Sequence, residues 1–204
     1  REGPAAFAQH FAEALKDALI AADVVTAAEL RAAVERLDAM GSKGEGARMV
    51  ARAWVDPGFK ARLLSDATAA AAELGISAAN NTAPTVLTVV ENTPTVQNLV
   101  VCTLCSCYPR SILGMSPDWY KSRSYRARAV REPRAVLAEF GTVLPSAGVA
   151  VRVHDSTADR RYMVLPMRPA GTQGWAEEEL ARLVTRDSMI GVCPATDPST
   201  MLSA

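Results

Sequence analysis

The sequence has no excess of charge of either sign, no long apolar run and no spread of cysteines along its length. Lysine plus arginine number 22, and aspartate plus glutamate also number 22. A chain of zero net charge has no overall field with which to attract nucleic acid or an anionic membrane. The N-terminal residues lack the apolar stretch of a signal peptide, and no later run is long enough to cross a bilayer. We therefore expect a cytoplasmic protein that binds neither nucleic acid nor membranes.

Cysteine is scarce and clustered. Three of the four cysteines, Cys102, Cys105 and Cys107, fall within six positions. A secreted protein held together by disulfides would spread its thiols along a short chain, so the clustering indicates metal or redox chemistry. The remaining cysteine, Cys193, lies far from the cluster, and we expect it to be a free thiol and not a ligand.

Hydrophobic spacing predicts helices in the first part of the chain. Residues 7–19 carry phenylalanine or leucine at every fourth position, which is one apolar stripe of a helix. Thr26 and Glu29 form a capping box that begins a second helix, and a third contains residues 49–54. Residues 59–74 are predicted to form one further helix.

The middle of the chain changes to the spacing of strands. β-branched residues predict a buried strand at 85–91, and residues 99–101 run apolar straight into the cysteine cluster. Alternation at 149–153, followed by a β-rich segment at 160–165, predicts a hairpin with one buried face. A helix that starts at a Glu-Pro pair is expected over 132–140.

The cysteine cluster has the composition of a metal loop. It reads CTLCSC, and a tight turn can aim the three sulfurs at one point. The backbone nitrogens of Ser106 and Cys107 can close small chelate rings with the flanking sulfurs, and deprotonated amides are strong-field donors. Three sulfurs and two nitrogens leave one position of an octahedral ion open for substrate or water. This donor set favours a low-spin trivalent metal over zinc.

Other cysteine chemistries stay open, although each lacks part of its pattern. A structural zinc site wants four ligands at paired spacings, yet no second CxxC or CxxH is present, and His10 and His154 are isolated. A thioredoxin-like pair of Cys102 and Cys105 leaves the third thiol, Cys107, unexplained. An iron–sulfur cluster would need a fourth thiol.

Residues 101–108, VCTLCSCY, resemble the metal-binding signature of nitrile hydratase alpha subunits and are close to that of the related thiocyanate hydrolase subunit. The resemblance continues through GARMVARAW (46–54), VVENTP (89–94), WYKS (119–122), YRARAVREPRAVLAEFG (125–141), RPAGT (168–172) and VTRDSMIGV (184–192). It implies a lyase that hydrates a nitrile to the corresponding amide at a non-corrin metal centre. Thiocyanate hydrolysis at the same kind of centre is the alternative reaction, and a non-catalytic zinc or redox module is the alternative of a different class.

The resemblance also implies the ligands and their chemistry. In the family the residue at Cys102 is the axial thiolate, while those at Cys105 and Cys107 become sulfinate and sulfenate. The amide nitrogens of Ser106 and Cys107 complete the set of protein ligands. The metal acts as a Lewis acid, and the attacking oxygen comes from the Cys107 sulfenate or from a nearby water. The catalytic residues predicted in this way are Cys107, Ser106 and Arg161.

Further expectations follow from the same resemblance. Thr103 and Tyr108 mark the cobalt type, so Co(III) is predicted, with Fe(III) as the alternative. The family fold is α+β, which predicts an N-terminal helical arm at 1–75 that embraces a partner. A layered α/β domain at 76–192 would carry the metal loop, and a flexible tail would follow at 193–204. The partner implied is a nitrile hydratase beta subunit, present as one chain or split in two.

Residues outside the cluster are carried over one by one. Arg161 aligns with a family arginine next to the cluster, and Asp155 and Asp159 align with acidic positions, with surface salt bridges as the alternative interpretation. Arg110 replaces a tryptophan that lines the family's substrate pocket. A charged wall favours a polar or larger nitrile, such as that of a nucleoside like toyocamycin. Gln97 and His154 also depart from the family pattern.

Overall fold

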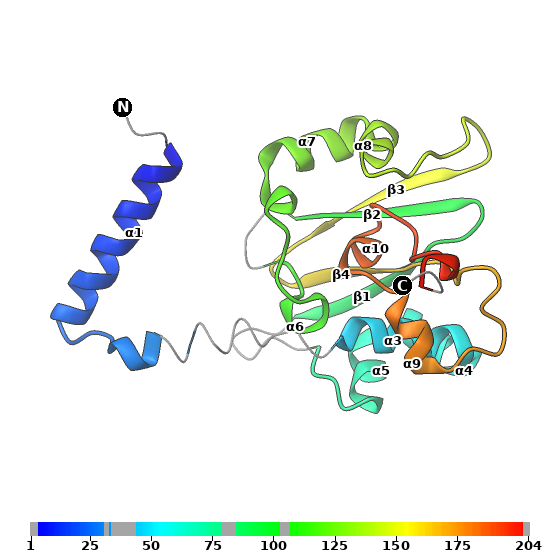
Figure 1. The fold of residues 1–204 in the computed structure, drawn as a ribbon, viewed down its shortest axis with the longest axis horizontal. Helices are drawn as coiled ribbons and strands as arrows, with labels where there is room; N and C mark the ends of the chain where they lie inside the picture. The colour runs from blue at the N-terminus through cyan, green and yellow to red at the C-terminus, as the bar shows by residue number, and fades with distance from the viewer. Residues whose placement is uncertain (1–3, 31–32, 34–43, 79–84, 103–106, 202–204) are drawn as a thin grey trace. The chain divides into compact units, whose positions relative to one another are not determined.

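A computed structural model describes residues 4–30, 33, 44–78, 85–102 and 107–201 (Figure 1). The chain divides into two compact units, Arg1–Ala39 and Met40–Ala204. The helices between 45 and 73 fall in the same unit as the strands. That second unit mixes helices and strands, as the α+β prediction requires.

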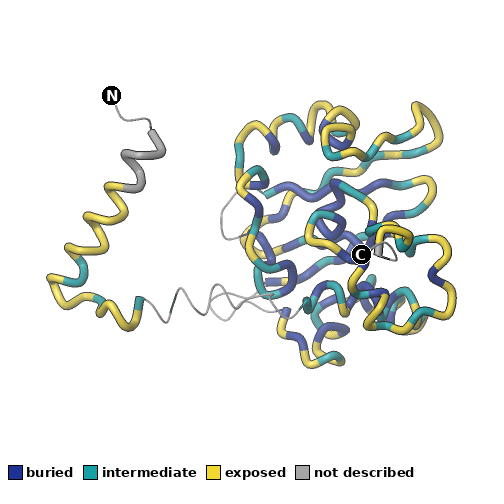
Figure 2. The backbone as a smooth tube through the Cα atoms, viewed as in Figure 1, coloured by how far each residue is buried: buried dark blue, intermediate teal, exposed yellow. Residues whose placement is uncertain are grey.

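The first unit consists mainly of helix α1 (Pro4–Ala21). Its apolar stripe is open to solvent along the described side chains, because Phe11 is 61% exposed and Leu15 is 49% exposed. Figure 2 shows most of this helix in the colour of exposed residues. The predicted capping box is confirmed: the Thr26 amide donates to the Glu29 carboxylate at 2.8 Å, and the Glu29 amide donates to Thr26 Oγ1 at 3.1 Å.

The second unit opens with three short helices: α3 (Glu45–Val55), α4 (Pro57–Ser65) and α5 (Ala67–Glu73). The prediction of one helix over 59–74 is wrong, because Asp66 interrupts it. The Asp66 side chain leaves the helical path and accepts a hydrogen bond from the Ala69 amide at 2.9 Å, so it caps α5. Asp56 caps α4 in the same way through the Phe59 amide. Aspartates placed at this spacing favour two capped helices over one continuous helix.

Within the described residues, four strands form two parallel pairs. These are β1 (Val86–Glu91) with β4 (Arg160–Leu165), and β2 (Val96–Cys102) with β3 (Ala150–Ser156). The predicted strands at 85–91 and 99–101 are confirmed, but the predicted hairpin is wrong. β3 and β4 follow each other in the chain, yet each pairs with a strand from much earlier. Alternation of apolar and polar residues determines which face of a strand is buried, but it does not determine which other strand pairs with it.

The remaining helices are α6 (Arg110–Leu113), η1 (Asp118–Lys121), α7 (Arg123–Arg131), α8 (Pro133–Glu139), α9 (Glu177–Arg182), α10 (Arg186–Ile190) and η2 (Pro198–Met201). The two helices α7 and α8 lie along β2 and β3, whereas α4 and α5 pack on β1 (Figure 1). Helix α10 contacts both β2 and β4, so it joins the two strand pairs. The predicted helix at 132–140 is confirmed by α8.

The core lies between these layers, and the strands are its most deeply buried part (Figure 2). Leu99 and Val101 of β2 and Met163 of β4 are fully buried. The chain stays packed beyond the predicted start of the tail, since the Thr196 amide donates to the Leu183 carbonyl at 2.8 Å. No helix within the described ranges combines the length and the hydropathy needed to cross a membrane.

Candidate metal centre

The strand pair β2 and β3 ends at the first cysteine of the cluster. Cys102 is the last residue of β2 and lies opposite Ser156, the last residue of β3. Ser156 is fully buried, and its Oγ accepts a hydrogen bond from the Tyr162 amide of β4 at 3.1 Å. The side chain of Ser156 therefore ties the end of β3, beside Cys102, to the beginning of β4. Spacing in the sequence gave no sign of this serine.

Cys107 follows the loop of residues 103–106 in the chain and comes shortly before α6. It is fully buried. Thr103, Cys105 and Ser106 fall outside the described residues, so the structure provides two of the predicted sulfurs. Within the described part of the chain, no three histidine, cysteine or acidic side chains gather around one point. The donors available to a metal there are Cys102 and Cys107, which flank the loop.

An aromatic cluster lies against these cysteines. The rings of Tyr108 and Tyr120 meet edge to face with centroids 5.1 Å apart, and those of Tyr120 and Tyr125 lie 5.8 Å apart. Burial raises the pKa of Tyr120, and the nearby charge of Cys102 is the next cause, which places this tyrosine close to the cluster. Desolvation favours the neutral hydroxyl, so these tyrosines keep a hydrogen that can be donated.

The hydroxyl of Tyr108 is the polar atom of this cluster that needs a partner. It is buried and has no hydrogen-bond partner among the described residues. Burial raises the pKa of Tyr108, while the charge of Arg186 lowers it to a smaller extent. A buried hydroxyl without a partner is costly, so it fits a site whose acceptor lies in the loop or on a ligand.

Arg161 lies at the same end of the strands as Cys102. It precedes Tyr162, whose amide reaches Ser156, and it shares one face of β4 with Met163. Arg161 is only 8% exposed, and its Nε has no hydrogen-bond partner among the described residues. Because a buried guanidinium is costly without an anion, this position fits a negatively charged group beside it. Oxidised cysteines of the loop would be such a group.

Arg110 begins α6 and is partly exposed. Its amide donates to the Tyr108 carbonyl at 2.9 Å, so its backbone is fixed close to the cluster. Asp155 instead pairs with Arg126 at 2.7 Å in an exposed salt bridge, and Asp159 is exposed. The structure thus keeps Arg110 beside the cluster and gives Asp155 the salt-bridge role that was its alternative interpretation.

The other departures from the family pattern belong to a polar network along β2. His154 Nε2 lies 2.8 Å from Asn98 Oδ1, and Gln97 Nε2 donates to the Gly191 carbonyl at 2.8 Å. Burial lowers the pKa of His154, and the charge of Arg152 adds to that effect. These side chains connect β2 to β3 and to the end of α10.

Cys193 does not belong to the CTLCSC segment. It is half-buried, forms no disulfide among the described cysteines, and has Thr185 Oγ1 at 3.9 Å from its sulfur. Burial raises the pKa of this thiol, so the neutral form predominates.

A pocket of about 320 Å³ opens at the opposite end of the strands and was missed from the sequence. Trp54, Lys60, Glu91 and Pro166 are among the residues that line it. It lies where β1 and β4 end and β2 begins. The length of β2 (Val96–Cys102), roughly 20 Å at about 3.3 Å for each step between residues, separates it from Cys102. It is therefore distinct from the cysteine cluster.

Comparison with known proteins assigns the chain to a family. The family model described as "Nitrile hydratase, alpha chain" matches residues 6–193. The chain belongs to this family. The nitrile hydratase resemblance inferred from the sequence is therefore confirmed.

The similar proteins include nitrile hydratases and a thiocyanate hydrolase, and their names mention cobalt or iron. The chain is 59% identical over 154 residues to the alpha subunit of a low-molecular weight cobalt-containing nitrile hydratase of Rhodococcus rhodochrous, which covers 76% of this chain and 72% of that protein. The structure of the present chain resembles that of an Fe-type nitrile hydratase of Comamonas testosteroni Ni1. The TM-score is 0.85, the identity is 44%, and the match covers 97% of this chain and 94% of that chain. A recombinant thiocyanate hydrolase with partially modified cobalt centres gives TM-score 0.82, 42% identity, and coverage of 93% and 90%.

Proposed function

We propose that this nitrile hydratase alpha chain holds a Co(III) ion in its cysteine loop and hydrates a polar nitrile together with a beta subunit. The observation that carries the proposal is that Cys102 and Cys107 flank the loop while Arg161 is buried at the same end of the strands, its Nε without a hydrogen-bond partner among the described residues. Cobalt is favoured because the alpha subunits of cobalt-containing nitrile hydratases are close relatives. Fe(III) is the alternative, since an Fe-type enzyme shares the fold.

The sulfurs of Cys102, Cys105 and Cys107 and the amide nitrogens of Ser106 and Cys107 would hold the ion. When bound, the ion supplies Lewis acidity that polarises the nitrile carbon. The buried position of Cys107 excludes bulk water, which strengthens electrostatic interactions at the site. Soft sulfur donors with strong-field nitrogens fit a trivalent cobalt ion better than zinc.

The chain's own residues would supply or orient the attacking oxygen and stabilise the negative charge. Oxidised Cys107 either provides the attacking oxygen or orients the attacking water, and the Ser106 hydroxyl can hold that water. Oxidised Cys105 and Cys107 add negative charge, which the Nε–H of Arg161 can stabilise with a charge-assisted hydrogen bond. Donors from the beta subunit would be needed for the remaining oxygens, so the isolated chain should turn over little substrate.

The cysteines themselves provide the test. In a co-expressed complex, Cys105→Ala and Cys107→Ala should each lose bound cobalt and nitrile hydration. Cys193→Ala is the matched control, because this cysteine lies outside the cluster, and it should keep both. Full turnover in the two cluster variants would refute the proposal.

Arg110 would determine which nitrile is accepted. Its backbone is held next to the cluster and its side chain is partly exposed, so a charged group can reach a bound substrate. A hydrogen-bonding wall favours a polar nitrile, such as that of the nucleoside toyocamycin, over a small aliphatic nitrile. Arg110→Trp should shift kcat/KM toward aliphatic nitriles by about tenfold or more. The control Arg123→Trp, on the exposed surface of α7, should leave the preference unchanged.

Thiocyanate hydrolysis is the second candidate reaction, because thiocyanate hydrolases are also relatives in sequence and structure. The two activities release different products. Assay of the same complex for amide from a nitrile and for carbonyl sulfide from thiocyanate separates them. Amide release with little carbonyl sulfide is the expected result.

The N-terminal helical region, proposed at 1–75, would embrace the beta subunit, in one chain or two. The exposed apolar positions Phe11 and Leu15 of α1 support this role, because a solvent-exposed apolar stripe favours burial against a partner. The double variant Phe11→Ser and Leu15→Ser should weaken co-purification of the partner. Equal recovery of the complex from variant and wild type would argue against the arm.

A further inference from the structure

We propose that Tyr125 is a positioning residue for the metal centre, and that its hydroxyl holds the strand that presents Cys102. The proposal rests on the function proposed above and adds a residue that lies outside the loop. Tyr125 belongs to the first turn of α7, whereas Cys102 ends β2.

The contact is a single buried hydrogen bond. The Tyr125 hydroxyl donates to the carbonyl of Val100 at 2.9 Å. Val100 lies two positions before Cys102 in the same strand and pairs with His154 in the register of β2 and β3. Helix α7 therefore fixes one side of β2 while β3 fixes the other. The last residues of β2 are held from both sides immediately before the cysteine.

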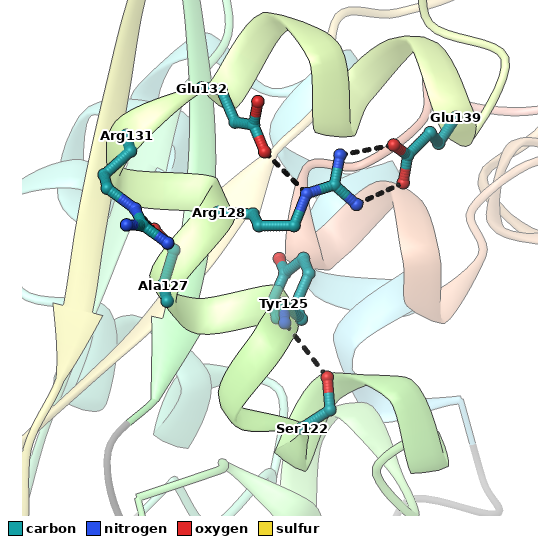
Figure 3. A network of polar contacts seen from close by, with 7 residues as sticks. All are labelled: Ser122, Tyr125, Ala127, Arg128, Arg131, Glu132 and Glu139. Carbon is teal, nitrogen blue, oxygen red and sulfur yellow. Dashed lines mark hydrogen bonds and ion pairs between the residues drawn. The ribbon is translucent and has the colours of Figure 1, made fainter.

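Tyr125 is itself held in place. Its amide donates to Ser122 Oγ at 3.0 Å, which caps α7 (Figure 3). The Trp119 ring packs edge to face against the Tyr125 ring with centroids 4.8 Å apart, and the Phe140 ring also meets it edge to face, at 6.5 Å. A side chain fixed by its backbone and by its ring has little freedom to follow a moving strand.

The helix that carries Tyr125 is also braced against its neighbour. Arg128, one turn further along α7, donates to Glu132 at 2.6 Å and binds both carboxylate oxygens of Glu139 on α8 (Figure 3). These side chains are largely exposed, so each pair adds little stability by itself. The bidentate pair of Arg128 and Glu139 links α7 to α8. The hydroxyl of Tyr125 thus reaches Val100 from a helix that is tied to its neighbour.

Loss of the Tyr125 hydroxyl should change the position of Cys102. Without it, the Val100 carbonyl is buried without its side-chain partner and the end of β2 can shift to find another. Groups that orient metal ligands from outside the coordination sphere commonly change metal affinity or activity by about 10- to 100-fold when removed. Burial raises the pKa of Tyr125, which keeps the hydroxyl a donor and agrees with this role.

The test is Tyr125→Phe in the complex co-expressed with its partner and cobalt. This substitution keeps the ring and removes only the hydroxyl. We expect a shift in the sulfur-to-metal charge-transfer absorption, cobalt release to a chelator that is about tenfold faster or more, and a lower kcat with KM little changed. Thr142→Val is the matched control, because the Thr142 hydroxyl also donates to a backbone carbonyl, that of Val192 at 2.7 Å, and neither residue belongs to β2 or to the cysteine loop. It should lower stability and leave the absorption, cobalt release and kcat unchanged.

The outcomes separate the two proposals. A wild-type complex without a bound trivalent metal overturns the proposed function and this role with it. A normal wild-type centre whose absorption, cobalt release and kcat are identical in Tyr125→Phe overturns the positioning role alone. If Tyr125→Phe fails to assemble, Ser122→Ala decides: it removes the cap that anchors Tyr125 and should give a smaller shift of the same absorption. An unchanged spectrum in Ser122→Ala would then reject the role.

Discussion

Cys102 and Ser156 lie opposite each other as the last pair of residues in the parallel strands β2 and β3. Ser156 is buried, and its Oγ accepts the Tyr162 amide of β4. One small side chain thus connects β3, the partner of the strand that ends at Cys102, with β4, the strand that carries Arg161. Stability at this end of the molecule should depend on it.

Removal of that hydroxyl should therefore be costly. Ser156→Ala leaves the Tyr162 amide without its acceptor in a buried position, and we expect a loss of about 1–3 kcal/mol in the free energy of unfolding. Urea denaturation of the full chain measures it. The control Ser65→Ala, at an exposed helix end, should stay within about 0.5 kcal/mol of wild type. Equal losses in both variants would contradict the connection.

Gly191 is required for a close approach between α10 and β2. It has φ +91°, and a Cβ there would overlap the Asn98 carbonyl oxygen and lie 2.9 Å from Val164 Cγ2. Gly171 also has positive φ, +79°, but a Cβ there would meet nothing within 4 Å. Gly171→Ala should cost about 1–2 kcal/mol from backbone strain alone. Gly191→Ala should cost about 1–3 kcal/mol more, because it adds overpacking.

Both glycine variants are measured by chemical denaturation of the full chain. If Gly191→Ala were no more destabilising than Gly171→Ala, the close contact between the two segments would be disproved.

His154 should make the stability depend on pH. Burial lowers its pKa in the folded chain, so the unfolded chain binds the proton more readily. Stability is then fully present above the ordinary histidine pKa of about 6.5 and is lost as the pH falls below it. His154→Gln should flatten the loss of unfolding free energy between pH values of about 7.5 and about 5.

Arg161 should have opposite effects in two states of the protein. In the isolated, reduced chain its buried guanidinium lacks an anion among the described residues, so Arg161→Met should be neutral or stabilising by about 1–4 kcal/mol. In the matured complex the same change should lower kcat by about tenfold or more, because oxidised sulfur loses a charged donor. Denaturation and steady-state kinetics give the two readouts. A variant that loses stability in the reduced chain would contradict this account.

Local signals in the sequence predicted much of the secondary structure. The Thr26 and Glu29 box, the strand at 85–91 and the helix at 132–140 depend on neighbours in the chain, and each is confirmed. The parallel pairing of β3 with β2 and of β4 with β1 was not foreseen, because pairing depends on which distant strand is available.

The same distinction applies to the site. The cysteine pattern pointed to a metal loop because its donors are adjacent in sequence, and the family match supports that interpretation. Ser156 and Tyr125 act across strand pairs and helix packing, so no spacing rule reveals them. Tyr125 stands in a segment that resembles the family, but nothing in the sequence marks its contact with Val100.

The central claim is that the loop of a matured chain holds one trivalent cobalt ion with oxidised sulfur beside it. Intact mass and metal analysis of the complex, purified after co-expression with its partner in the presence of cobalt, tests it most directly. The account predicts one cobalt per chain and a mass increase from oxygen that peptide mapping assigns to Cys105 and Cys107. A fully active complex that contains zinc or no metal, with unmodified thiols at both positions, would contradict it.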